Sequence, residues 1–162
     1  MVSAVEGGRL ADGVAVDSFT EFVLEVEPRL KRALVAAFGR DAGMDAVAEA
    51  LAYGWENWDR VQMMDNPAGY LWTVGRNRAR TRRRSRPVFP PMPSSGEPWV
   101  EPGLPDAMAA LSEAQRTAVV LLHGFGWTAR EVAELVGSSE SSVRTHAVRG
   151  MAKLRRKLGT DR

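Results

Sequence analysis

The most regular pattern of hydrophobic and polar positions lies between Ser112 and Leu158. Apolar side chains recur there every three or four positions in three successive stretches, which is the spacing of the buried face of an amphipathic helix. Short stretches rich in glycine and serine, at 124–126 and 137–139, separate the three. The pattern predicts three helices joined by two tight turns, which is the arrangement of a helix-turn-helix.

Capping residues indicate where these helices begin. Gln115 follows Ser112 by three positions and Glu131 follows Thr128 by three, so each pair has the sequence of a capping box. Ser139 is the expected N-cap of the last helix. Three helix starts are therefore predicted, at Ser112, Thr128 and Ser139.

The last of these helices has the composition of a DNA-recognition helix. Recognition helices direct their N-terminal side chains toward base edges and their flanks toward phosphates. We therefore predict that bases are read by Ser141, Arg144 and Thr145, with His146 as a further candidate. The predicted phosphate contacts are Arg149, Lys153, Arg155 and Arg156. A solvated helix face would explain any single basic residue, but the complete pattern favours DNA binding.

The hydrophobic pattern of the first half predicts three more helices. The first runs from Asp17 or Ser18 to Phe38, and Pro28 should kink or divide it. The second follows a loop at 39–43 and has a buried edge made of Val47, Leu51, Trp55 and Trp58. The third begins at Asn66 and Pro67, a residue pair that suits an N-cap and a first helical position.

Composition changes along the chain suggest where the domains end. Residues 87–103 contain six prolines among serine and glycine, which excludes helix and favours a semi-extended linker. Residues 1–16 lack a sustained period and are expected to be a flexible tail. The prediction is an all-α chain with two small helical domains, at 17–86 and 104–162. A short helix over 104–111 leads into the second domain.

Charge is distributed unevenly between these segments. Residues 1–65 contain twelve acidic and six basic residues, whereas residues 76–86 contain seven arginines and no acid. Such a basic block continuing a helical pattern favours contact with nucleic acid. The polar residues expected on the exposed side of the third helix are Arg76, Asn77, Arg80, Arg83 and Arg84.

Composition also excludes several classes of function. The chain has no cysteine, which rules out disulfides, thiol catalysis and thiolate metal sites. Its two histidines, His123 and His146, do not form a metal-binding pair. We therefore predict no catalytic residue, no metal site and no cofactor. No apolar run reaches membrane-spanning length and no signal-peptide pattern opens the chain, so a soluble, cytoplasmic protein without membrane insertion is expected.

Three motifs in this order give the chain a specific resemblance. Residues 45–60 contain Asp45-Ala-Val-Ala-Glu49 followed by Trp55 and Trp58-Asp59-Arg60, residues 70–77 read Tyr-Leu-Trp-Thr-Val-Gly-Arg-Asn, and residues 111–116 and 142–145 read Leu-Ser-Glu-Ala-Gln-Arg and Ser-Val-Arg-Thr. From about residue 18 to residue 158 the chain resembles the extracytoplasmic-function sigma factors of bacterial RNA polymerase. Ala46, Ala48 and Gly75 are smaller than or different from the residues usual in that family.

The resemblance implies a role for each motif. Asp45, Glu49 and Trp58 would belong to the segment that docks on core RNA polymerase. Asp65 and Asn66 would capture an unstacked base of the minus-ten promoter element, while the third helix holds the adjacent DNA. The helix-turn-helix would read the minus-thirty-five element. The implied partners are core RNA polymerase, promoter DNA and an anti-sigma factor, and the catalysis would belong to the polymerase.

Two other functions remain open on the sequence. The segment 142–146 and residues 152–154 also resemble the recognition helix of LuxR-type regulators, which bind an operator as dimers and need no polymerase-docking surface. The chain could alternatively be a sigma-like protein-interaction module that sequesters a partner. The acidic helices argue against a LuxR-type regulator, and the basic helix faces argue against a protein-interaction module.

Overall fold

The computed structural model describes the backbone of residues 6–83 and 103–159, and the side chains of residues 15–82 and 103–159. Every regular element within these ranges is a helix, so the predicted all-α fold is confirmed. No helix among the described residues is long and apolar enough to span a membrane. The predicted linker at 87–103 lies outside the described residues except for Gly103.

Three long helices and one short helix form the N-terminal half. They are α1 (Glu6–Phe38), α2 (Arg40–Glu56), α3 (Trp58–Val61) and α4 (Pro67–Arg83). Helix α1 begins well before the start near Asp17 that the sequence predicts, and it continues through Pro28 without division. Pro28 is exposed, so its ring faces solvent and the carbonyl that it leaves unpaired can bind water.

The core of this half forms where α1, α2 and α4 meet. Leu30, Leu34 and Leu71 are fully buried there. Ala46 is also buried, with 2% of its surface exposed, so it packs inside the fold instead of lying on a docking surface. The small side chain at this position therefore permits close approach of the helices.

An aromatic cluster closes the other end of α2. The rings of Phe19 and Phe22 lie 5.2 and 4.9 Å from the ring of Trp58, and the Trp58 Nε1 donates a hydrogen bond to Ser18 Oγ at 2.8 Å. Trp58 is 7% exposed, whereas Trp55 is 48% exposed although it touches Phe19. Trp58 therefore lies in the core, as the pattern predicts. Trp55 was predicted on the same buried edge but lies partly on the surface.

The C-terminal half contains five elements. They are α5 (Leu104–Ala109), α6 (Glu113–Val119), a π-helical turn η1 (Val120–Gly124), α7 (Ala129–Val136) and α8 (Glu140–Leu158). Both predicted capping boxes form, Ser112 with Gln115 and Thr128 with Glu131, and Ser139 caps α8. The π-helical turn was not predicted, because its wider hydrogen-bonding pattern has no distinct sequence period.

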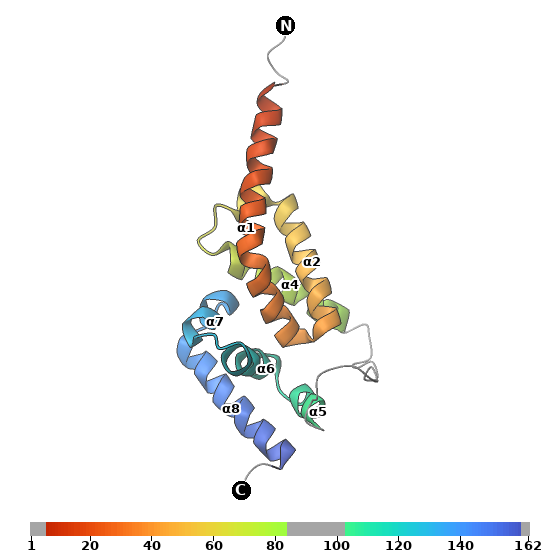
Figure 1. The fold of residues 1–162 in the computed structure, drawn as a ribbon, viewed down its shortest axis with the longest axis vertical. Helices are drawn as coiled ribbons and strands as arrows, with labels where there is room; N and C mark the ends of the chain where they lie inside the picture. The colour runs from red at the N-terminus through yellow and green to blue at the C-terminus, as the bar shows by residue number, and fades with distance from the viewer. Residues whose placement is uncertain (1–5, 84–102, 160–162) are drawn as a thin grey trace.

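The two halves pack against one another. Figure 1 shows α6 and α8 lying below α1 and α2, with α7 beside the lower end of α1, and residues of α1 and α4 contact α6 and α7. Leu121, Val132 and Leu135 of the C-terminal half belong to the same buried cluster as Leu30 and Leu34. One apolar core therefore spans both halves, and a second, smaller cluster of α5, α6 and α8 contains Ala107, Leu111, Val119 and Leu154.

Candidate nucleic-acid interface

Helix α8 presents one polar face to solvent because its other face is buried. Val143, Ala147, Gly150 and Leu154 pack inward. Gly150 permits this packing, since a Cβ there would lie only 2.7 Å from Val119 Cγ2 of α6. The outward-facing residues include Ser141, Arg144, Thr145 and Arg149. These are the residues predicted from the sequence to meet DNA, and the structure places them on one exposed surface.

Two predicted upstream-element residues have structural partners within the chain. His146 is partly buried and lines a cavity of about 280 Å³ between α4 and the C-terminal half. The Nζ of Lys153 donates a hydrogen bond to the carbonyl of Ala110 at 2.5 Å. Neither side chain lies fully in the exposed face of α8, and Lys153 helps to fix α8 to the end of α5.

Arg144 is held at the start of the exposed face by a residue of its own helix. Its Nη2 lies 2.7 Å from Glu140 Oε2, one turn earlier. The pair is exposed on both sides, so it stabilises the helix only weakly. It orients the guanidinium and leaves it accessible to a ligand.

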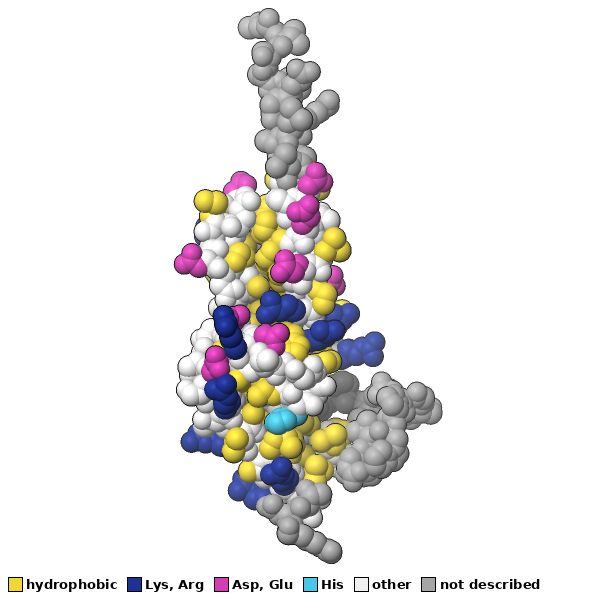
Figure 2. All heavy atoms as spheres, turned by 60° about the vertical axis from the view of Figure 1, so that its left-hand side comes forward, with side chains coloured by type: hydrophobic (Ala, Val, Ile, Leu, Met, Phe, Trp, Pro, Cys, Tyr) yellow, Lys and Arg dark blue, Asp and Glu magenta, His cyan; other side chains and the backbone are white. Residues whose placement is uncertain are grey.

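Basic and acidic side chains occupy different parts of the surface. In the view of Figure 2, most Asp and Glu side chains lie over the upper half of the molecule, and Lys and Arg side chains cross its middle and continue below. The uneven charge that the sequence shows is therefore also a spatial separation. The basic part includes residues of α4 and α8, which are the two helices predicted to bind DNA.

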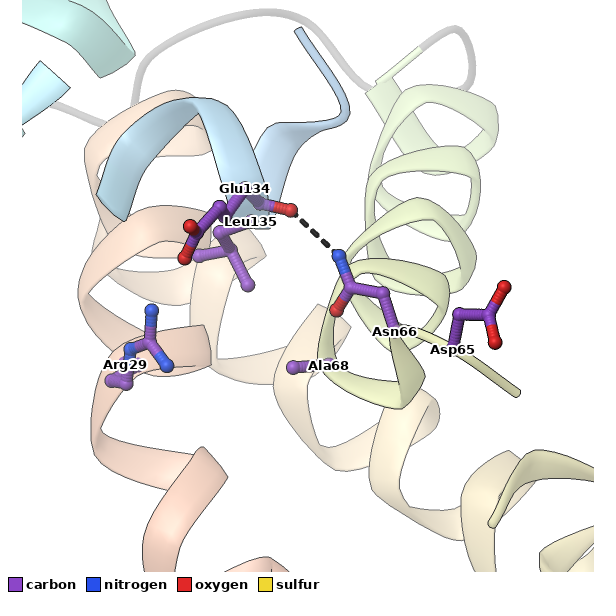
Figure 3. Close-up of a pocket in the computed structure, with 6 residues that line it drawn as sticks. All are labelled: Arg29, Asp65, Asn66, Ala68, Glu134 and Leu135. Atoms are coloured by element: carbon purple, nitrogen blue, oxygen red, sulfur yellow. Dashed lines mark hydrogen bonds between the residues drawn. The ribbon is translucent and has the colours of Figure 1, made fainter. Parts of the chain in front are cut away.

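The predicted base-capturing residues lie at a cavity between the two halves. Asn66 caps α4 by accepting a hydrogen bond from the Gly69 N–H at 2.8 Å, and its Nδ2 donates to the carbonyl of Glu134 in α7 at 2.7 Å. Figure 3 shows Asn66 reaching across to α7, with Asp65 beside it. The cavity has a volume of about 320 Å³, and its lining is Arg29, Asp65, Asn66, Ala68, Glu134 and Leu135.

Two arginines of α4, Arg76 and Arg80, also reach the C-terminal half. The Nε of Arg76 lies 2.6 Å from Glu113 Oε1, and the Nε of Arg80 lies 2.8 Å from Glu113 Oε2. Asn77 faces solvent and its carbonyl accepts a hydrogen bond from Thr81. The side chain of Arg83 and the whole of Arg84 lie outside the described residues.

Asp45 and Glu49, which the resemblance assigns to polymerase docking, are paired with arginines of α4. Arg82 bridges the two carboxylates, and its Nη1 lies 2.8 Å from Asp45 Oδ2. Arg78 lies 3.8 Å from Glu49. Arg78 and Arg82 were not among the residues predicted from the sequence. Their spacing of four residues, matching that of Asp45 and Glu49, was the signal that could have revealed them.

Two tyrosines and an arginine extend the α2–α4 surface beyond these ion pairs. The hydroxyls of Tyr53 and Tyr70 lie 3.1 Å apart, and the guanidinium of Arg60 donates to both. The hydrogen bond between the two hydroxyls raises the pKa of Tyr70 above its usual value of 10.0, and the positive charge of Arg60 opposes that shift. Tyr70 therefore remains neutral at physiological pH.

The C-terminal half matches a known protein family. Residues 103–154 match the family described as sigma-70, region 4. The match covers less than half of the chain, so it describes the C-terminal half alone. No curated protein sequence matches the chain.

The fold of the whole chain is similar to that of a solved sigma factor. That structure is the sigma factor RpoE in complex with the anti-sigma factor NepR, from Bartonella quintana. The TM-score is 0.64 and the sequence identity is 22%, and the similarity covers 90% of this chain and 99% of the RpoE chain. Together with the family match, this fold confirms the predicted resemblance to extracytoplasmic-function sigma factors. The family is one of transcription factors without catalytic activity.

Proposed function

We propose that this chain is a sigma factor that binds core RNA polymerase and directs recognition of minus-ten and minus-thirty-five promoter elements. The observation that supports it most directly is the exposed face of α8. Ser141, Arg144, Thr145 and Arg149 face outward on a helix-turn-helix whose sequence matches sigma-70 region 4. A helix of this kind reads an upstream element in the major groove.

The N-terminal half supplies the two other functions that the proposal requires. Asp45 and Glu49 are two acids one turn apart on α2, and this charged surface, where both are ion-paired with arginines of α4, suits docking to polymerase. Asn66, Arg76 and Arg80 lie along α4 and its N-terminus, where they suit a promoter strand that has been opened. Proteins hold single strands in positively charged grooves that follow the phosphate backbone, together with aromatic side chains on which the bases stack.

The docking step can be tested by co-elution of the full chain with core RNA polymerase in size-exclusion chromatography. We expect the wild-type chain to co-elute and the Asp45→Ala, Glu49→Ala double variant to elute separately. Because these acids also pair with Arg78 and Arg82, a loss of the internal ion pairs must be distinguished from a loss of the contact.

Two controls make that distinction. The Arg78→Gln, Arg82→Gln variant breaks the same ion pairs but keeps both acids, and it should still co-elute. The Glu56→Ala variant removes an exposed acid from the same helix and should also co-elute. If the wild-type chain fails to co-elute but binds duplex DNA, the chain is instead a free-standing regulator of the LuxR type.

A further inference from the structure

One carboxylate in this structure holds the two arginines that the proposed function assigns to downstream DNA. Glu113 directs Oε1 to Arg76 Nε at 2.6 Å and Oε2 to Arg80 Nε at 2.8 Å. The Glu113 side chain is 17% exposed, whereas the arginines are 36% and 46% exposed. The acid is therefore the most enclosed member of the group, and it comes from the other half of the molecule.

The geometry of this group is one that a phosphate could also satisfy. Arg76 and Arg80 are one helical turn apart on α4, so their guanidinium groups face the same side of the helix. Each donates to a different oxygen of one anion. A phosphodiester presents two charged oxygens in a similar way, and arginine binds carboxylate and phosphate through the same charge-assisted hydrogen bonds.

The position of Glu113 is fixed by its own helix. It is the first residue of α6 and directly follows the N-cap Ser112. The capping box locks this turn, because the Gln115 N–H donates to Ser112 Oγ at 3.2 Å and the Ser112 N–H donates to Gln115 Oε1 at 3.1 Å. The carboxylate is thus presented to α4 by a rigid helix start.

A second contact between the halves covers the other predicted downstream residue. Asn66 Nδ2 donates to the carbonyl of Glu134, and α7 lines one side of the cavity at Asp65 and Asn66 (Figure 3). Leu121, Val132 and Leu135 anchor the C-terminal half in the shared core. In this closed arrangement the downstream residues face α6 and α7, while the polar face of α8 remains exposed.

We propose that Glu113 is an internal competitor of DNA phosphate: it occupies Arg76 and Arg80 in the free chain and must leave before these arginines bind downstream DNA. The inference rests on the proposed function, because it takes these arginines as DNA contacts. The proposal implies that upstream DNA and the melted strand are bound in a fixed order. The closed chain can bind upstream DNA through α8, but it binds a melted strand only after the two halves separate at Glu113.

The test compares three substitutions in the full chain. Glu113→Gln removes the negative charge at nearly constant size. Glu113→Asp keeps the charge but shortens the side chain by one methylene, so that it cannot reach both arginines. Asp106→Asn is the matched control, because it removes one exposed acid from the same half and Asp106 lines neither cavity between the halves.

Two measurements are made on each protein. The first is anisotropy of a labelled mixed-sequence 20-nucleotide single strand at fixed low salt. The second is the distance between spin labels on α1 and α8, introduced as Leu24→Cys and Ala152→Cys at two exposed positions in a chain that has no native cysteine. We expect both Glu113 variants to bind the strand roughly five- to tenfold more tightly than wild type and to show longer label distances. Asp106→Asn should match wild type within about twofold.

Three results would overturn the proposal. One is unchanged strand affinity in both Glu113 variants. Another is an equal gain in Glu113→Gln and Asp106→Asn with none in Glu113→Asp, which would indicate a general charge effect. The third is separation of the labels without any gain in affinity. Circular dichroism confirms folding, and Glu113→Asp provides the test if Glu113→Gln does not fold. None of these measurements uses polymerase, so failure of polymerase docking is recognised independently.

Discussion

A Cβ atom on Gly75 would lie 2.8 Å from Leu34 Cδ1 and 3.1 Å from the carbonyl oxygen of Ala46. Gly75 is therefore the residue that lets α4 approach α1 and α2 closely. Gly43 has the same role between α2 and α1, where an added Cβ would lie 2.6 Å from the backbone of Val35. The two glycines differ in what surrounds them, since Leu34 can change its rotamer but the backbone of Val35 cannot move as easily.

Alanine substitutions should reveal this difference. Gly43→Ala is expected to lower the free energy of unfolding by about 2 kcal/mol, because overpacking against backbone outweighs the gain in helix propensity. Gly75→Ala should lower the free energy of unfolding by less than Gly43→Ala does. Gly124→Ala is the control, since the nearest atom to its added Cβ would be 3.8 Å away. Urea denaturation gives the loss in free energy of unfolding for each of the three variants. A larger loss for Gly75→Ala than for Gly43→Ala would contradict the prediction.

These glycines show which parts of the fold the sequence predicts and which parts it does not. Apolar spacing and capping residues act within a few positions of one another, so the helices and the starts at Ser112, Thr128 and Ser139 could be predicted. The need for Gly75 depends on α1 and α2, which are distant in sequence. From periodicity alone, Gly75 would be expected to destabilise α4. The close contact with α1 and α2 instead requires a residue without a side chain at this position.

The candidate site divides in the same way. The exposed face of α8 follows from the spacing of Val143 and Ala147, and was predicted. The pairing of Glu113 with Arg76 and Arg80 joins residues from the two halves, and no local pattern indicates it. Trp58 and Trp55 show the same limit: both lie on the apolar edge of one pattern, and only the packing of Phe19 and Phe22 decides which of them is buried.

The capping box of α7 should make stability depend on pH. Glu131 accepts hydrogen bonds from the N–H and hydroxyl of Thr128 at 2.7 and 2.8 Å, and these bonds hold its pKa below the usual 4.5. A carboxyl whose pKa is lower in the folded state stabilises the fold above its unfolded pKa. That contribution is lost as the pH falls below 4.5 and through the folded pKa.

Glu131→Gln removes this titration and keeps an amide that can still close the capping box. We expect the melting temperature of wild type to fall more steeply than that of the variant between pH 5.5 and about 3. Glu25→Gln changes an exposed carboxyl on α1 and serves as the control, with a pH profile parallel to that of wild type. Parallel profiles for Glu131→Gln and wild type would contradict the prediction.

Arg149 and Lys153 were both predicted to contact phosphate, but the structure indicates different roles. Arg149 is exposed, whereas the Lys153 ammonium binds the Ala110 carbonyl. Arg149→Gln should weaken duplex binding and reduce the slope of log affinity against log salt by about 0.9. Lys153→Gln should leave that slope unchanged and lower the melting temperature, because it releases α8 from α5.

A mixed-sequence 30-base-pair duplex is the appropriate probe for this comparison, since backbone contacts do not depend on sequence. Anisotropy titrations at several salt concentrations give the slope for each variant. Arg149→Lys controls for geometry and should retain most of the wild-type slope. Equal slope changes for Arg149→Gln and Lys153→Gln would show that Lys153 leaves Ala110 when DNA binds.

Val148 is an exposed apolar residue of α8 for which no role was predicted from the sequence. Its side chain is 69% exposed, and it lies one turn beyond Arg144 and Thr145 on the polar face. An apolar side chain among base-reading residues suits the methyl group of a thymine in the major groove. If α8 reads the upstream element as proposed, one thymine there should contribute through its methyl group.

Replacing thymine by uracil removes only that methyl group. On a duplex recovered by selection from random sequence, single uracil substitutions should identify one position where wild-type affinity falls. The expected loss is about fourfold, which corresponds to the free energy of burying one carbon group. The Val148→Ala variant should bind the thymine and uracil duplexes equally at that position. Leu24→Ala, which truncates an exposed residue of α1, should respond to uracil as wild type does. Sensitivity to uracil that persists in Val148→Ala would assign the thymine contact to another side chain of α8.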